Sequence, residues 1–321
     1  MWEFSVFRAL GLLLRTLPYV LFRASVVIGI AAALLLAAGL GAGIGQAFSG
    51  LRPAVPASTF AFWGGATGLC LVALAVLALR GRILHRVGVG HLALMVEVLD
   101  RRPVPVLGNQ PALGRSLTAE RFGDAAALTA LDRLVRGVIR TATGLVDDLL
   151  VGTVPVAPLD RAVRATGLHL RLAQGLLESV VLAHALRTRS ENAWEAAHDG
   201  LVLYTQNARP IMATALGLSL TGWVLAGAVA IGVLPAALSL AALLPDVPGT
   251  ALLLALVFGW ALKATLYDPF AQACLLQLHL RLTRDQDPLP EWRGRLTQVS
   301  DKFRQLGERA LRWQPRAAPD A

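Results

Sequence analysis

Two ionisable residues, Lys263 and Asp268, lie within or directly beside an apolar stretch of the chain. Charges inside a bilayer are costly and commonly mark a path for ions or solutes. Pro269 follows Asp268, has no N–H to donate, and so leaves the carbonyl of Thr265 without a helical partner. The pair is therefore a candidate for lining a solute path. The alternative is that Lys263 lies close enough to the membrane surface for its ammonium to reach water.

Three aromatic residues, on the apolar stretch that holds this pair and on the one before it, complete the candidate set: Trp223, Trp260 and Tyr267. Trp260 and Tyr267 are seven residues apart, so a helix places them on one face. Aromatic faces can hold a quaternary ammonium by cation–π attraction. Aromatic residues also anchor helices at membrane interfaces, and that alternative stays open.

Other patterns that could support chemistry are incomplete. Glu195 and His198 are three residues apart, as in helical di-metal sites, but no second such motif accompanies them. Cys70 and Cys274 lie in or beside apolar segments and indicate neither a disulfide framework nor a zinc site. No nucleotide-binding or nucleophile motif is present. We expect no enzyme activity, no cofactor and no metal.

The elements that carry these residues are four apolar tracts, each about as long as the 20 residues that a helix needs to cross a bilayer. They span Ala24–Gly45, Phe60–Leu79, Ile211–Leu234 and Ala251–Tyr267. Hydrophobic residues make up 55% of the 321 and charged residues 16%, whereas soluble domains average about 25% charged. The sequence therefore predicts an all-α membrane protein with four transmembrane helices in two hairpins.

Arginines are distributed unevenly around these tracts. Arg52 is the one basic residue between the first and second tracts, and none separates the third from the fourth. The positive-inside rule then predicts that both termini and the central segment are cytoplasmic, in a bacterial-type inner membrane. The net charge is +9; we expect the cytoplasmic arginines to attract anionic lipid headgroups, and we expect no nucleic acid partner.

The predicted organisation has five parts. They are an interfacial amphipathic helix at 1–23, a transmembrane hairpin at 24–79, a helical cytoplasmic domain at 80–209, a second hairpin at 210–281, and a cytoplasmic amphipathic helix with a disordered end at 282–321. The alternative for 1–23 is a plain extension of the first spanning helix. In the central domain, the segment 172–186 is nearly uncharged and is expected to be a buried core helix; a re-entrant or fifth membrane segment is the alternative.

Local signals refine this organisation. Gly39, Gly41, Gly43 and Gly45 form two small-xxx-small frames that favour close helix packing against the second tract. Ser116 or Thr118 is expected to cap a long helix, and Ser190 the helix that starts near 192.

The tail has apolar residues at alternating spacings of four and three, which predicts one amphipathic helix. They are Trp292, Leu296, Val299, Phe303, Leu306, Ala310 and Trp313. This seam could pack on the cytoplasmic helices, pair with copies of itself, or lie on the membrane.

The second half of the chain resembles the carboxyl-terminal part of the choline transporter-like proteins. The resembling pieces are Arg189-Ser190-Glu191-Asn192-Ala193, the fourth tract after Val247-Pro248, Leu278-His279-Leu280-Arg281-Leu282 and Pro288-Leu289-Pro290. The resemblance implies a transporter-like ancestry. The chain is shorter than members of that family, so no substrate-binding residue is carried over.

Two functions from different classes follow from these patterns. The first is an oligomeric transporter or channel for a small solute, with a cation as one option, because four crossings rarely enclose a path alone. A homo-oligomer is expected on that reading. The alternative is a non-catalytic membrane scaffold that recruits partners through its cytoplasmic helices.

Overall fold

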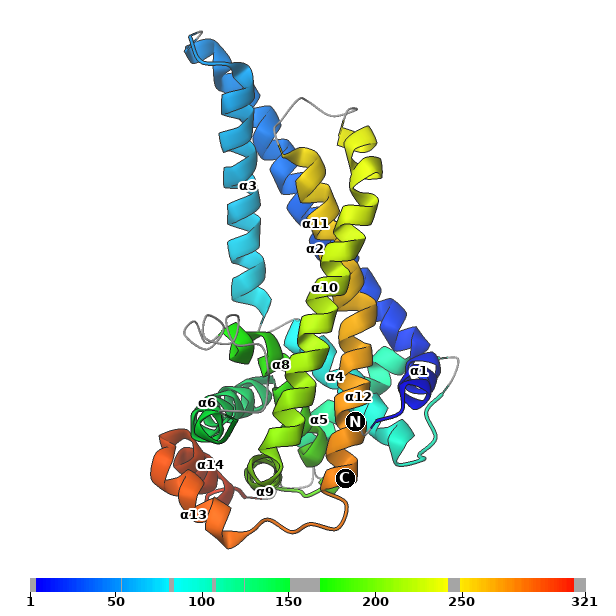
Figure 1. The fold of residues 1–321 in the computed structure, drawn as a ribbon, viewed down its shortest axis with the longest axis vertical. Coiled ribbons are helices and arrows are strands. Elements are labelled where there is room, and N and C mark those ends of the chain that lie inside the picture. Colours follow the sequence, from blue (N-terminus) through cyan, green and yellow to red (C-terminus); the bar gives the residue numbers. More distant parts are fainter. Residues whose placement is uncertain are drawn as a thin grey trace, which may run out of the picture. The chain divides into compact units, whose positions relative to one another are not determined.

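The computed structural model describes residues 4–52, 54–80, 84–105, 108–123, 125–150, 168–241 and 249–314, and every regular element within these ranges is a helix (Figure 1). The predicted loops at 152–158 and 245–248 and the predicted disordered end at 315–321 lie outside the described residues.

Four helices are long and apolar enough to cross a membrane. They are α2 (Leu17–Ala47), which continues into the short η1 (Phe48–Leu51), α3 (Ala57–Arg80), α10 (Ala208–Ala241), and the continuous helix made of α11 (Thr250–Leu262), η2 (Lys263–Tyr267) and α12 (Asp268–Leu282). The described chain thus has the helices of a multi-pass membrane protein. Each exceeds its predicted tract, and α10 passes through Pro235 without ending there, as helices in lipid surroundings tolerate.

The chain divides into two compact units. One unit comprises Val20–Val87 and Thr221–Pro269 and so holds most of the four long apolar helices. The other comprises Met1–Tyr19, Gly88–Leu220 and Phe270–Ala321. The residues of the predicted charge site, Lys263 and Asp268, belong to the first unit.

Glycines bring α2 and α3 into backbone contact. A Cβ added to Gly41 would collide with the carbonyl of Gly64, and one on Gly45 with the carbonyl of Phe60. Two residues turn an α-helix by about 200°, so Gly43 lies on the opposite face of α2 from these contacts. A Cβ there would meet nothing within 4 Å. One of the two predicted glycine frames is therefore used to pack α3, and the other is not.

Small residues also line the contact between α10 and α11. A Cβ on Gly259 would press against the carbonyl of Ala226. Farther along the same two helices, Ala230 and Ala237 pack with Ala251 and Ala255 in one buried cluster. The order of these contacts runs in opposite directions along the two helices, so α10 and α11 are antiparallel neighbours.

The other unit is built from shorter amphipathic helices. They are α1 (Val6–Arg15), α4 (Leu84–Leu99), α5 (Gln110–Phe122), α6 (Ala125–Leu150), α8 (Leu168–Thr188), α9 (Ala193–Gln206), α13 (Pro290–Val299) and α14 (Asp301–Leu311). The middle of α8 is buried, including Leu177, Val180 and Val181, and α8 packs on α6 and α9. That is the arrangement expected of a core helix.

The amino-terminal prediction was wrong in its boundary. The first helix, α1, ends at Arg15, and α2 already begins at Leu17. Thr16 separates them and is fully buried; its hydroxyl donates to the carbonyl of Leu12 and lies 3.0 Å from Nε2 of His91. A polar side chain held in this way fixes the break between the two helices.

The predicted helix caps were also wrong. Ser116 and Thr118 lie inside α5, and the Asn109 side chain caps that helix by accepting a hydrogen bond from the backbone N–H of Ala112. At α9 the cap is Asn192, not Ser190. The asparagine carboxamide is as good a cap as the serine hydroxyl, so composition alone did not separate the candidates.

The tail forms two helices where the sequence predicts one. Ser300 caps α14 through its hydroxyl, which accepts from the backbone N–H of Phe303, and this divides α14 from α13. Val299 is consequently exposed and leaves the seam. Leu296, Phe303 and Leu306 are fully buried, and α14 packs on α6 and α9 of the same chain (Figure 1).

Candidate functional site

Lys263 and Asp268 form an ion pair. Nζ of Lys263 lies 2.7 Å from Oδ1 of Asp268, and the two side chains are 13% and 32% exposed. The lysine is thus largely withdrawn from the surroundings of the helix, whereas the aspartate is partly exposed. The distance is that of a charge-assisted hydrogen bond, the stronger kind in proteins.

The π-helical element η2 makes this contact possible. Residues five apart on an α-helix point about 140° away from one another, since each residue turns the helix by about 100°. In a π-helix the backbone bonds join residues five apart. The N–H of Asp268 indeed donates to the carbonyl of Lys263, so backbone and side chains link the same two residues.

Pro269 explains why the helix widens at this point. A proline inside a helix has no N–H to offer the carbonyl four residues earlier, and its ring clashes with that carbonyl. Here that carbonyl belongs to Thr265, in the middle of the π-helical turn. The sequence signal at Pro269 was correct in marking a local disturbance, but it did not predict the change of register.

Trp223 of α10 also contacts the Lys263 ammonium. Nζ of Lys263 lies 4.7 Å from the centroid of the Trp223 ring, within the range of a cation–π interaction. The ammonium is therefore held between a carboxylate and an indole face. A lysine that extends to the membrane surface would instead leave its ammonium in water.

Gly222 leaves the space that the site requires. A Cβ on Gly222 would lie 2.6 Å from Cε1 of Tyr267 and 3.3 Å from Cε of Lys263. The Tyr267 ring and the Lys263 stem therefore pack directly on the α10 backbone. Reasoning from the sequence missed Gly222, because a single glycine in a glycine-rich helix carries no distinguishing signal.

Trp260, the remaining candidate, lies one turn before Lys263 and is partly exposed. Lys263 contacts Asp268 and Trp223. The contacts described above therefore join four of the five predicted residues, Lys263, Asp268, Trp223 and Tyr267.

The depth of the site follows from the helix rise. Lys263 is 13 residues after Thr250, which corresponds to about 20 Å along the helix axis. If a hydrocarbon core about 30 Å thick begins near Thr250, the Cα of Lys263 lies about 10 Å from its far boundary. Asp268 is then close to that boundary, so the ion pair leads from the core toward the headgroups.

His198, from the incomplete metal motif, and its neighbour Asp199 make contacts within the protein. His198 stacks on Phe303 with ring centroids 4.0 Å apart, and Asp199 pairs with Arg293 at 2.7 Å. Both contacts attach the tail to α9. Among the described residues, no group of three metal-ligating side chains is close enough to hold an ion.

His184 of α8 is a titratable group in the core of its unit. Burial lowers the pKa of the His184 imidazole, Asp199 raises it by charge attraction, and Arg187 lowers it by repulsion, in that order of size. The His279 ring lies 6.3 Å away, and Gly200 packs against the His184 ring. His184 is therefore held in its neutral form more strongly than a free histidine.

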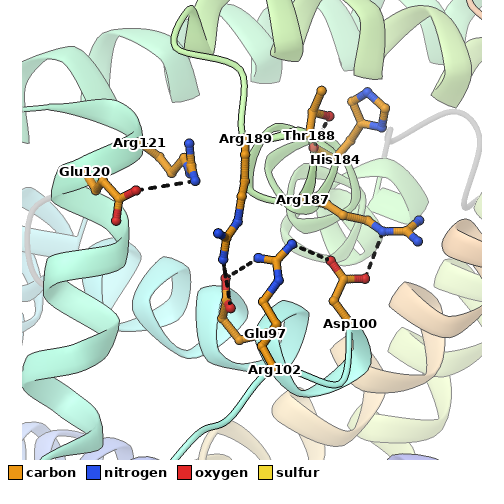
Figure 2. A network of polar contacts seen from close by, with 9 residues as sticks. All are labelled: Glu97, Asp100, Arg102, Glu120, Arg121, His184, Arg187, Thr188 and Arg189. Carbon is orange, nitrogen blue, oxygen red and sulfur yellow. Dashed lines mark hydrogen bonds and ion pairs between the residues drawn. The ribbon is translucent and has the colours of Figure 1, made fainter.

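Several arginines predicted to face lipid headgroups are paired within the protein. Figure 2 shows Arg102 and Arg189 on the Glu97 carboxylate, and Arg102 and Arg187 on that of Asp100. The three guanidiniums and two carboxylates join the end of α4 to the end of α8. Arg189 adopts a left-handed backbone with φ 51° at the end of α8, which turns the chain where its side chain meets Glu97.

Comparison with protein-family models, with curated proteins and with solved structures finds no match in any of the three. The resemblance to the choline transporter-like proteins therefore stays a prediction, and function has to be argued from the site itself.

Proposed function

We propose that this protein is an oligomeric transporter- or channel-like membrane protein for a small solute, and that the solute passes the Lys263–Asp268 pair. The observation that carries the proposal is this largely enclosed ion pair within one of the long apolar helices, with its lysine against Trp223 of another. Ionisable residues within membrane helices are rare and commonly belong to solute paths.

The helix geometry around the pair supports the same function. A π-helical turn inside an α-helix is frequently found at functional sites, and this one lies between the two charged residues. A change from π to α register would separate Lys263 from Asp268, because the two would then face different sides of the helix. The pair could thus open and close with a local change of register.

The long apolar helices have faces that are uncovered within one copy and that lipid or further copies can cover. On α3 the large apolar side chains Trp63, Leu71, Leu74 and Leu77 are exposed, and on α2 the Gly39/Gly43 frame packs on nothing in the described chain. Four helices seldom surround a path alone, so we propose a homo-oligomer whose copies complete it.

The proposed orientation places both termini in the cytoplasm of a bacterial-type inner membrane, with anionic headgroups against the cytoplasmic arginines. It follows from the arginine distribution. In a variant without Cys70 and Cys274, a cysteine at Ser58 should react with an impermeant thiol reagent in intact cells. A cysteine at Gln298 should react only after lysis; labelling of Gln298 in intact cells would reverse the orientation.

A non-catalytic scaffold is the alternative from a different class. It would recruit partners through the cytoplasmic helices and the tail, and the seam of the tail is covered by α6 and α9 of the same chain, with Phe303 and Leu306 fully buried. That contact leaves the seam unavailable to another protein unless the tail detaches. The arrangement therefore argues against recruitment through the tail seam and leaves recruitment through the cytoplasmic helices to the flux test.

The test of the proposal is solute flux. The purified protein is reconstituted into lipid vesicles, and uptake is measured for inorganic ions and organic cations, with empty vesicles as the control. We expect saturable uptake of at least one solute and a particle mass of more than one chain. Uptake equal to that of empty vesicles for the whole panel would contradict transport and favour the scaffold.

A further inference from the structure

We propose that the Asp268 carboxylate and the Trp223 ring form a binding site for a small ammonium-type monocation, and that the Lys263 side chain is an internal competitor for that site. The inference rests on the proposed function, because it assigns a chemical class to the solute. It concerns what the side chains around Nζ of Lys263 recognise.

The surroundings of Nζ are those that a free ammonium ion requires. A carboxylate oxygen lies 2.7 Å from it, an aromatic face lies 4.7 Å from it, and the lysine side chain is only 13% exposed. Anion, π face and partial exclusion of water are the three features by which proteins bind ammonium groups. The Lys263 ammonium therefore fills the site that the Asp268 carboxylate and the Trp223 ring offer to a cation.

The lysine is suited to being displaced. Its ammonium is a point charge on a flexible four-carbon stem, and Asp268, its ion-pair partner, is one third exposed. One carboxylate does not neutralise two cations side by side, so a solute cation and the Lys263 ammonium exclude one another. Binding of the solute displaces the lysine, and return of the lysine releases the solute.

The neighbouring groups limit the size of the cation. Gly222 allows the Tyr267 ring and Cε of Lys263 to pack directly on α10, so the stem fills the space behind the ammonium. What a solute can replace without moving this packing is the terminal ammonium group alone. Methylammonium has the charge of that group and is only one methyl group larger, so it is the probe of choice.

Lys263→Met separates the charge of the lysine from the packing of its stem. Methionine has the length of the lysine stem and lacks only the charged end, so it vacates the ammonium position and keeps the packing. The expected result is that methylammonium binds Lys263→Met on the order of tenfold more tightly than the parent. The reason is that a site open for only a fraction of the time loses affinity in proportion to that fraction.

Binding is measured in detergent as the rise of the melting temperature with methylammonium chloride, at constant ionic strength against sodium chloride. Lys302→Met is the matched control, since Lys302 is the other lysine of the chain and lies on the tail. It should behave as the parent. Adding Asp268→Asn to Lys263→Met should remove the methylammonium effect.

Equal affinity of the parent and Lys263→Met, or binding that persists without the Asp268 charge, would overturn the inference. If Lys263→Met does not fold, Lys263→Ala is titrated with butylammonium, which restores both stem and charge. The inference requires that butylammonium raise its melting temperature, with Lys302→Ala unaffected; no difference between the two would overturn it.

The outcome is separable from that of the flux test. Tighter binding to Lys263→Met without any parental flux would leave the cation site standing and remove transport. If the parent transports a different solute, and methylammonium binds neither the parent nor Lys263→Met, transport would be supported and the cation site would be contradicted.

Discussion

Lys263 and Asp268 meet at 2.7 Å although they are five residues apart on one helix, and the π-helical turn of η2 brings them together. An unbroken α-helix would point the two side chains in different directions. The ion pair therefore depends on the backbone register. Pro269 sets that register because it has no N–H to donate to the carbonyl of Thr265.

Gly222→Ala should disturb this site from the neighbouring helix. The added methyl group would lie 2.6 Å from Cε1 of Tyr267, and overpacking of this kind costs about 1–3 kcal/mol. Gly227→Ala on the same helix is the control, because a Cβ there meets nothing within 4 Å. The measurement is the melting temperature in detergent; equal melting temperatures for the two variants would show that Tyr267 does not pack on α10.

Gly41→Ala should weaken the contact between α2 and α3. A methyl group at Gly41 would collide with the backbone of Gly64, whereas one at Gly43 would meet no neighbour. We expect Gly41→Ala to lower the free energy of unfolding by about 1–3 kcal/mol. Gly43→Ala should change it little within a single copy. A larger effect at Gly43 than at Gly41 would mean that the other face of α2 carries the main helix contact.

The contact between the tail and α9 should depend on Phe303. Its ring is fully buried and stacks on His198, and replacement of a buried phenylalanine by alanine costs about 3–5 kcal/mol. Leu311, on the same helix, is 88% exposed, so Leu311→Ala should stay within about 0.5 kcal/mol. Increased protease sensitivity of the tail in Phe303→Ala, but not in Leu311→Ala, would confirm the docking.

Stability should fall in mild acid because of His184. Burial lowers the pKa of His184 in the folded state from its usual 6.5, so the unfolded chain binds a proton there at a higher pH than the folded chain does. The stabilisation is complete above pH 6.5 and is lost as the pH falls below that value toward the folded pKa. In His184→Gln the loss of melting temperature from about pH 7 to about pH 5 should be smaller than in the parent. An identical pH dependence would show that His184 has the same pKa in both states.

Several parts of the structure could be predicted from the sequence. The four long helices follow from the length and apolarity of their tracts, because twenty residues without charge have few stable alternatives. The contact of α2 with α3 follows from the glycine frames, although the sequence did not distinguish Gly41, which packs on α3, from Gly43, which does not. The apolarity of a tract predicts that it forms a helix, but it does not predict which face of that helix packs on a neighbour.

Other features depend on contacts that a linear sequence does not contain. Trp223 reaches Lys263 only because Gly222 lets α10 and η2 approach closely. Phe303 of the tail is buried because its ring stacks on His198 of α9. In each case a local choice was decided by a partner distant in the sequence.

The most direct test of the account is uptake of solute by vesicles that contain the parent, Lys263→Met, Lys263→Arg or Lys302→Met at equal protein content. If the pair lies on the solute path, Lys263→Met removes the group that releases the solute, and Lys263→Arg misplaces it because the guanidinium is broader and planar. The account predicts that both lose flux by on the order of tenfold or more, a barrier change of about 1.4 kcal/mol, with melting temperatures near that of the parent. Lys302→Met should retain the parental rate. Parental flux in both Lys263 variants would contradict the central claim that the Lys263–Asp268 pair lines the path.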